Sequence, residues 1–206
     1  MSPVTRSMEA TEAASAAAVA RARRAQPSGW WGAVLLIATE VTLFSCLIAT
    51  YFYLRFKSVE WPLGGIEKPS VGLPLALTAL LVASVVPMAA AVRAAKRGRA
   101  GLAWWLLAAA TAIQAVYLGL QIHLFVGDLG SFSPSDNAYA SIYFALPGIH
   151  HLHVAVGLLI DAWLLAKLSG GLSNYRLVAL RVGALYWYFV AAVAIPVVLT
   201  QLYPSL

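Results

Sequence analysis

Glu40, His150 and His153 are the residues whose side chains could do acid–base or metal chemistry inside apolar stretches of the sequence. Placing an ionisable group in apolar surroundings is costly, so such residues are candidates for function. At about 100° per residue, His150 and His153 share one face of a helix, whereas His151 points away from that face. Together with the Glu40 carboxyl they could relay a proton, hold a metal ion or join two helices by hydrogen bonds.

We predict that these three residues form an interhelical polar core held by hydrogen bonds. A metal site needs three or four converging ligands, and two nearby histidines with one distant carboxylate fall short of that. The single cysteine, Cys46, excludes disulfide frameworks and zinc ribbons. The sequence also shows no nucleophile–base pair, phosphate-binding loop or dinucleotide-binding glycine pattern. We therefore predict no catalytic residue, no metal and no cofactor in this chain.

Further polar residues lie in the same apolar stretches. Asp161 shares the helical face of the two histidines and precedes Arg176 and Arg181, so we expect an ion pair with one of these arginines. The third apolar stretch carries another polar face, made by Gln114, Tyr117 and Gln121. Such faces predict that the stretches pack against other protein as well as against lipid.

The composition predicts the elements that position these residues. Of 206 residues, 61% are hydrophobic and 11% are charged, against about 45–50% and about 25% in soluble domains. The mean hydropathy is +0.79. Five apolar stretches are long enough to cross a bilayer, which takes about 20 residues. They cover residues 30–56, 71–95, 102–126, 139–166 and 177–202. Because backbone groups in lipid must pair internally, we predict an all-α, polytopic integral membrane protein with five transmembrane helices.

The charges predict the orientation of these helices. The net charge is +6, which could indicate a nucleic-acid partner, but basic residues also collect in cytoplasmic loops of membrane proteins. With a cytoplasmic N-terminus, eleven of the fourteen Lys and Arg residues lie on the cytoplasmic side. We therefore predict that the N-terminus is cytoplasmic, that the C-terminus lies outside, and that no nucleic acid is bound. Residues 1–28 are predicted to be a flexible cytoplasmic tail, followed by one transmembrane domain over residues 29–206.

Several motifs resemble cytochrome c oxidase subunit III of the haem-copper oxidases, in its five-helix bacterial form. One is the run from Gly32 to Phe44, in which Glu40 matches the buried carboxylate of the family. Another is the run from Leu73 to Ser84, with its Pro-Leu-x-x-Thr pattern. The most specific is the run from Tyr139 to Gly157, with its His-x-x-His-Val-x-x-Gly pattern. The run from Tyr186 to Val190 is similar to the Tyr-Trp-His-Phe-Val motif of the family. Tyr188, Ala191 and Ala194 depart from the family, which has His, Asp and Trp there.

The resemblance implies a non-catalytic subunit of a proton-translocating terminal oxidase in a bacterial inner membrane. In that family, haem and copper lie in partner subunits, subunit III packs on subunit I near subunit II, and phospholipid binds in a cleft. The family role is to sustain proton uptake and stability during aerobic electron transport. By this resemblance we expect lipid headgroups near Arg176 and Arg181.

Three alternatives stay open at the level of sequence. Two lie close to the same family: subunit III of a quinol oxidase, and the accessory protein of nitric oxide reductase. The residues of this chain do not separate them, because another subunit binds the electron donor. The third is a small proton-coupled transporter that uses Glu40 and the His pair as a relay. Five spans without paired Gly or Pro interruptions argue against two transporter repeats.

Overall fold

Long α-helices account for most of residues 27–206, the part of the chain that the computed structural model describes. They are α2 (Ser28–Lys57), α3 (Gly72–Ala83), α4 (Val85–Lys96), α5 (Ala100–Ser131), α6 (Ala138–Leu168) and α7 (Asn174–Leu202). Two short 3₁₀ turns, η1 (Leu63–Gly65) and η2 (Tyr203–Ser205), complete the described elements, which include no strand.

These helices confirm the all-α prediction of five membrane-spanning segments. Taking α3 with α4 as one span, and α7 with η2 as another, five segments are long and apolar enough to cross a bilayer. Four of them begin one to three residues before the predicted spans and the second begins one residue later, while the helices end up to five residues beyond the predicted spans. The predicted tail, residues 1–28, lies almost wholly outside the described residues.

The second predicted span is interrupted at its middle. Ser84 forms a turn between α3 and α4, and its hydroxyl donates to the Leu81 carbonyl at 2.6 Å. Pro87 follows three residues later and has no N–H to donate to the Ala83 carbonyl, so the helical hydrogen bonding is weakened at this turn. The predicted span over residues 71–95 is confirmed as one membrane-crossing segment, Gly72–Lys96, which contains a one-residue turn at Ser84 facing α5.

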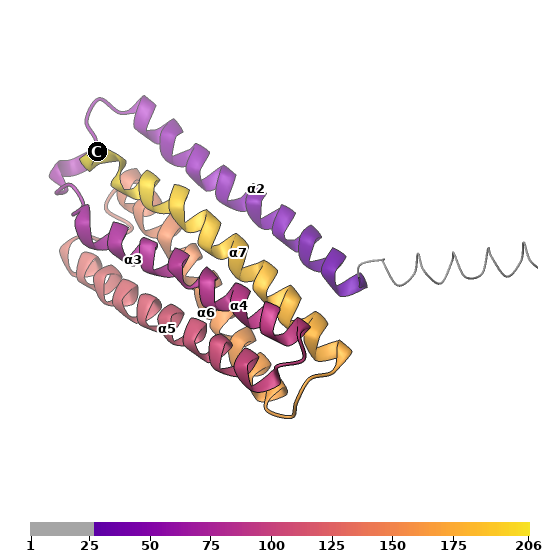
Figure 1. Ribbon diagram of the computed structural model, residues 1–206. Coiled ribbons are helices and arrows are strands. Elements are labelled where there is room, and N and C mark those ends of the chain that lie inside the picture. Colours follow the sequence, from indigo (N-terminus) through magenta and orange to yellow (C-terminus); the bar gives the residue numbers. More distant parts are fainter. Residues whose placement is uncertain (1–26) are drawn as a thin grey trace, which may run out of the picture.

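Helix α7 lies at the centre of the bundle and contacts α2, α3, α4 and α6 (Figure 1). Helix α5 covers α3, α4 and α6 from the other side. Helix α2 is peripheral: it contacts α6 and α7, and only Phe44 and Tyr51 among its residues are buried. Most of the apolar surface of α2 is therefore open to lipid or to a partner.

Helices α6 and α7 approach each other closely at a glycine. A Cβ atom added at Gly157 would lie 2.6 Å from Cζ2 of Trp187, well inside van der Waals contact. Trp187 is 1% exposed and among the largest fully buried side chains. Gly157 therefore makes room for the indole between the two helices.

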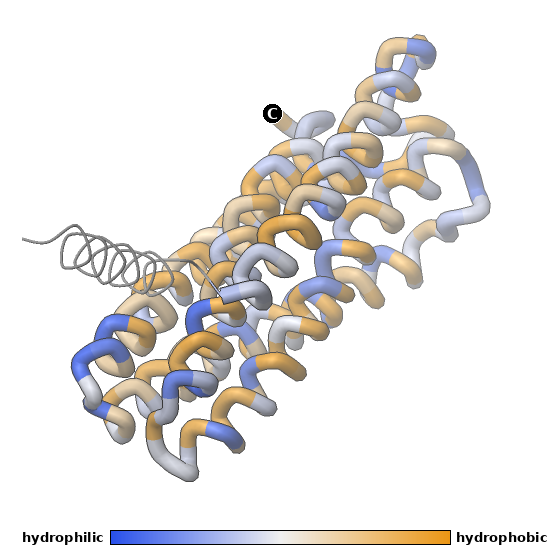
Figure 2. The backbone as a smooth tube through the Cα atoms, turned by 90° about the vertical axis from the view of Figure 1, so that its right-hand side faces the viewer, coloured by the Kyte–Doolittle hydropathy of each residue, from blue (hydrophilic) through white to orange (hydrophobic). Residues whose placement is uncertain are grey.

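Hydrophilic residues gather at the two ends of the bundle (Figure 2). One end carries the α4–α5 and α6–α7 connections with the start of α2, and we call it the basic end. Its described basic residues are Arg93, Lys96, Arg97, Arg99, Lys167, Arg176 and Arg181. The other end carries the α2–α3 and α5–α6 connections and the C-terminus, and we call it the opposite end (Figure 1). There, Arg55, Lys57 and Lys68 accompany Glu60, Glu67, Asp128 and Asp136.

Candidate functional site

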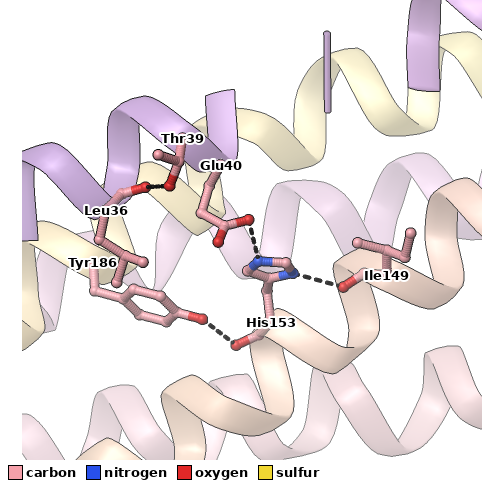
Figure 3. A network of polar contacts seen from close by, with 6 residues as sticks. All are labelled: Leu36, Thr39, Glu40, Ile149, His153 and Tyr186. Atoms are coloured by element: carbon pink, nitrogen blue, oxygen red, sulfur yellow. Dashed lines mark hydrogen bonds and ion pairs between the residues drawn. The ribbon is translucent and has the colours of Figure 1, made fainter. Parts of the chain in front are cut away.

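A direct contact between Glu40 and His153 joins α2 to α6 near the middle of both helices (Figure 3). The distance from Glu40 Oε2 to His153 Nε2 is 3.0 Å. The other ring nitrogen, Nδ1, lies 2.8 Å from the carbonyl oxygen of Ile149, one turn earlier on α6. The imidazole is thereby held at both nitrogens.

This geometry fixes how protons are shared between the two side chains. A carbonyl oxygen only accepts, so Nδ1 of His153 carries a proton and donates it to Ile149. Between Nε2 and Oε2 lies one further proton, which belongs either to a carboxylic acid that donates or to an imidazolium that donates. In both cases the pair is neutral overall, which makes its position among apolar helices tolerable.

The pair is partly open at the side of the bundle. The Glu40 side chain is 23% exposed and that of His153 is 14% exposed. Phe44, one turn after Glu40, packs on the imidazole with ring centroids 5.2 Å apart. From α7, the Tyr186 hydroxyl donates to the backbone carbonyl of His153 at 2.9 Å (Figure 3). Three helices therefore meet at this contact, and sequence reasoning had missed Tyr186.

His150 lies one turn from His153, away from Glu40 and inside the bundle. It is 2% exposed, and its ring packs near those of Phe44 and Tyr117, at centroid distances of 6.3 and 6.4 Å. Neither ring nitrogen has a hydrogen-bond partner among the described residues. Of the two predicted histidines, the structure thus brings only His153 to Glu40.

Asp161 belongs to a second buried polar cluster, formed with α5 and the α3–α4 break. It is fully buried, and its Oδ2 atom lies 3.2 Å from the Thr111 hydroxyl. The Gln114 amide fits best with its nitrogen toward this carboxyl, 2.9 Å from Oδ2, and with its oxygen 3.3 Å from the Ser84 hydroxyl oxygen. Trp187 of α7 also interacts with the Asp161 carboxyl. The indole N–H of Trp187 and the Oδ1 atom of Asp161 nevertheless lie outside hydrogen-bond geometry.

The arginines expected near Asp161 lie at the start of α7. Arg176 donates from Nη1 to the carbonyls of Gly170 and Gly171, at 2.5 and 2.8 Å, and so braces the α6–α7 connection. Asp161 finds its hydrogen bonds on α5 instead. The sequence predicts a polar face with Gln114 but not its contact with Asp161. Thr111, which lies three residues earlier on the same face, is the residue that could have indicated this cluster.

The described side chains can hold helices together and exchange protons. Among residues 27–206, no group of three or more His, Cys, Asp or Glu side chains is arranged to hold a metal ion. The fold and these clusters define a class: a polytopic α-helical membrane protein whose polar residues join helices in the bundle interior.

Comparison with known proteins places the chain within this class. Residues 13–204 match the family model described as Cytochrome c oxidase subunit III. The chain is 32% identical over 165 residues to the cytochrome bo(3) ubiquinol oxidase subunit 3 of Pseudomonas aeruginosa, covering 78% of this chain and 76% of that protein. It is 30% identical over 169 residues to the cytochrome c oxidase subunit 3 of Bacillus subtilis, covering 80% and 79%.

A quinol oxidase subunit 3 of Bacillus subtilis is 29% identical over 171 residues, covering 80% of each chain. The chain belongs to the cytochrome c oxidase subunit III family, which includes subunits of both cytochrome c and quinol oxidases. As a subunit III it associates with other oxidase subunits in a membrane complex.

Proposed function

We propose that this chain is the non-catalytic subunit III of a bacterial cytochrome c oxidase, packed on the catalytic subunit I in the plasma membrane. The observation that carries the proposal is the Glu40–His153 contact on α2, a helix that buries little of its own surface. The contact fixes α2 on the bundle while leaving its apolar face available to a partner. Subunit II, with copper, and the haems of subunit I would then supply the redox chemistry.

Phospholipid binding is a second part of this proposal. An apolar cleft of about 400 Å³ opens between α2, α6 and α7 in the half nearer the basic end. Its lining includes Ile37, Trp163 and Val182, and Arg181 directly precedes Val182. An acyl chain in this cleft would place a phosphate headgroup near the arginines at the start of α7, which agrees with the expectation for Arg176 and Arg181.

Proton uptake is the activity that such a subunit would support. Glu40 and His153 share a single proton at a position partly open to the side of the bundle. We expect this pair to keep α2 and its bound lipid in place, and so to preserve the partner's proton-uptake path during turnover.

Co-purification tests the proposal. An affinity-tagged chain should bring down a haem- and copper-containing subunit I together with subunit II after gentle detergent extraction. A variant in which three exposed apolar residues of α2, Leu35, Val41 and Leu43, become Ser should lose haem protein. The control changes Leu159 of α6 to Ser, because this apolar side chain is also exposed on the surface of the bundle. Recovery of the wild-type chain alone, or with a bound haem of its own, would contradict the proposal.

The electron donor needs a separate measurement, because one similar relative is named as a ubiquinol oxidase subunit. The purified complex should reduce oxygen with reduced cytochrome c as donor. Oxidation of a quinol without cytochrome c oxidation would favour the second candidate, subunit III of a quinol oxidase.

A further inference from the structure

Two cavities meet at the opposite end of the bundle, where the C-terminus lies in Figure 1. The outer cavity measures about 690 Å³ and lies between the α2–α3 and α5–α6 connections. The inner cavity measures about 60 Å³ and lies between α5, α6, α7 and the start of α3. Both are lined by Pro69, Ser70, Asp128 and Tyr143, so they adjoin each other, and we call the two together the inlet.

The inlet reaches into the part of the bundle that the membrane surrounds. Its inner lining includes Gln121, ten residues before the end of α5 at Ser131, and His151, thirteen residues after the start of α6 at Ala138. At a rise of 1.5 Å per residue, these side chains lie roughly 15 and 20 Å along their helices from that end.

Polar groups line the inlet along its length. Tyr143 donates to Asp128 at 2.8 Å near the mouth and also interacts with Gln201 of α7. Gln121, Gln201 and His151 follow further in. Pro147 lies in the same wall, and because it has no N–H, the Tyr143 carbonyl on this helix lacks its usual helical partner. Lipid chains satisfy none of these groups, whereas water satisfies all of them.

Buried polar atoms beside the inlet also lack protein partners. The Tyr139 hydroxyl has none among the described residues, although its side chain is fully buried near Asp128 and Tyr143. Both nitrogens of His150 are likewise without a partner. His150 packs near Tyr117, which interacts with Gln121 in the inlet. Such atoms in native proteins are commonly satisfied by ordered water.

Hydrogen bonds tie together the connections that surround the mouth of the inlet. Asn137 donates to the Leu63 carbonyl at 3.3 Å and so ties the α5–α6 connection to the α2–α3 connection. Ser205 donates to the Pro69 carbonyl at 2.7 Å and adds the C-terminus to the same rim. An inner volume of about 60 Å³ accommodates about two waters, at roughly 30 Å³ each.

We propose that the inlet is a water-filled passage, open to the aqueous phase at the opposite end, that brings water to Gln121 and His151 inside the transmembrane bundle. It places exchangeable water beside Gln121, which lies one helical turn after Tyr117, and beside His151, which directly follows His150. Its ligand is water itself, together with the protons that water carries. This proposal does not depend on which electron donor the complex uses.

Cysteine accessibility tests the inlet. Cys46, the free and exposed cysteine, is first replaced by Ser, and single cysteines are then placed at Gln121 and at His151. Each has a sequence neighbour on the outer surface of the bundle as its matched control, because Ile122 is 47% exposed and Leu152 is 62% exposed in this chain. The whole complex is reconstituted in lipid nanodiscs, treated with a small, permanently charged methanethiosulfonate, and analysed by intact mass.

We expect the cysteines replacing Gln121 and His151 to react about tenfold or more faster than their controls, because the thiolate that reacts forms only where water reaches it. A cysteine replacing Ser70 should react fastest, since it lines the mouth. If the Gln121 and His151 positions are as unreactive as their controls while Ser70→Cys reacts, the inlet is closed and the proposal is overturned. Equal, fast reaction at Ile122→Cys and Leu152→Cys would overturn it as well.

A second pair of variants covers the case in which His151→Cys does not assemble. Gln201 lines the same inner cavity but belongs to α7, and Leu199, two residues earlier, is 45% exposed on the surface of the bundle. Gln201→Cys should again outpace Leu199→Cys by about tenfold or more. Only complexes with an unchanged haem spectrum are compared, and equal rates at these two positions would contradict the inlet.

Discussion

At the scale of single residues, the hydrogen bond between Glu40 and His153 makes a prediction about its own protonation. Glu40→Gln keeps a donor that can reach the bare Nε2 of a neutral imidazole, whereas Glu40→Ala leaves that nitrogen without a partner. We expect Glu40→Gln to change the free energy of unfolding by less than about 1 kcal/mol and Glu40→Ala to lower it by about 1–3 kcal/mol. Thermal unfolding of the purified complex measures both.

The control for this pair is Thr39→Val, because Thr39 is exposed and its hydroxyl bonds only the Leu36 carbonyl of its own helix. It should leave stability nearly unchanged. A loss with Glu40→Gln as large as with Glu40→Ala would argue for a carboxylate paired with an imidazolium, against a carboxylic acid that donates to a neutral imidazole.

Which histidine meets Glu40 could not be read from the sequence. His150 and His153 lie on the same helical face, so both satisfy the spacing argument. The choice depends on where α2 lies across that face, and few of its own residues are buried to fix this position. The partners of Asp161 could not be read from the sequence either. The sequence predicts an ion pair with an arginine that follows it, whereas its hydrogen bonds come from Thr111 and Gln114, fifty and forty-seven residues earlier.

At the scale of elements, the packing of α6 on α7 depends on the absence of a side chain at Gly157. Gly157→Ala places a methyl group 2.6 Å from Trp187 Cζ2, and the indole is too enclosed to move. Overpacking of this kind typically costs about 1–3 kcal/mol. We expect a lower thermal unfolding temperature of the complex and, as a local sign, a changed environment of Trp187 in its fluorescence.

Gly119→Ala is the matched control, because Gly119 lies inside α5 with nothing within 4 Å of an added Cβ. Alanine has the higher helix propensity by up to about 1 kcal/mol, so this variant should be neutral or slightly stabilising. Equal destabilisation by both substitutions would mean that α6 and α7 are not packed through Gly157.

The elements themselves were largely predictable, since length and hydropathy decide a transmembrane helix. The predicted span 139–166 became α6, Ala138–Leu168, despite the internal Pro147. The span 71–95 was predicted as one helix but divides at Ser84. Both spans contain an internal proline, so composition did not tell which proline would break its helix. At the turn, the Ser84 hydroxyl bonds the Leu81 carbonyl and lies against Gln114 of α5, a contact that the pattern of apolar residues does not predict.

At the scale of the whole molecule, the unequal charge of the two ends predicts orientation. Seven described basic residues gather at the basic end, without a described acidic residue in its two connections. The opposite end combines three basic with four acidic residues. Because Lys and Arg in short loops stay on the cytoplasmic side, the basic end should face the cytoplasm and the C-terminus should face outward.

Fusions to alkaline phosphatase measure this, because the enzyme forms its disulfides and becomes active only outside the cytoplasm. A fusion after Leu206 should be active, and fusions after Gly98 and Gly170, in the two connections of the basic end, should be inactive. Replacing Lys96, Arg97 and Arg99 with Gln should reduce this contrast, because it removes charge from the α4–α5 connection alone. The reverse activity pattern would place the inlet on the cytoplasmic side, where it would draw its water from the same compartment as the proton uptake of the oxidase.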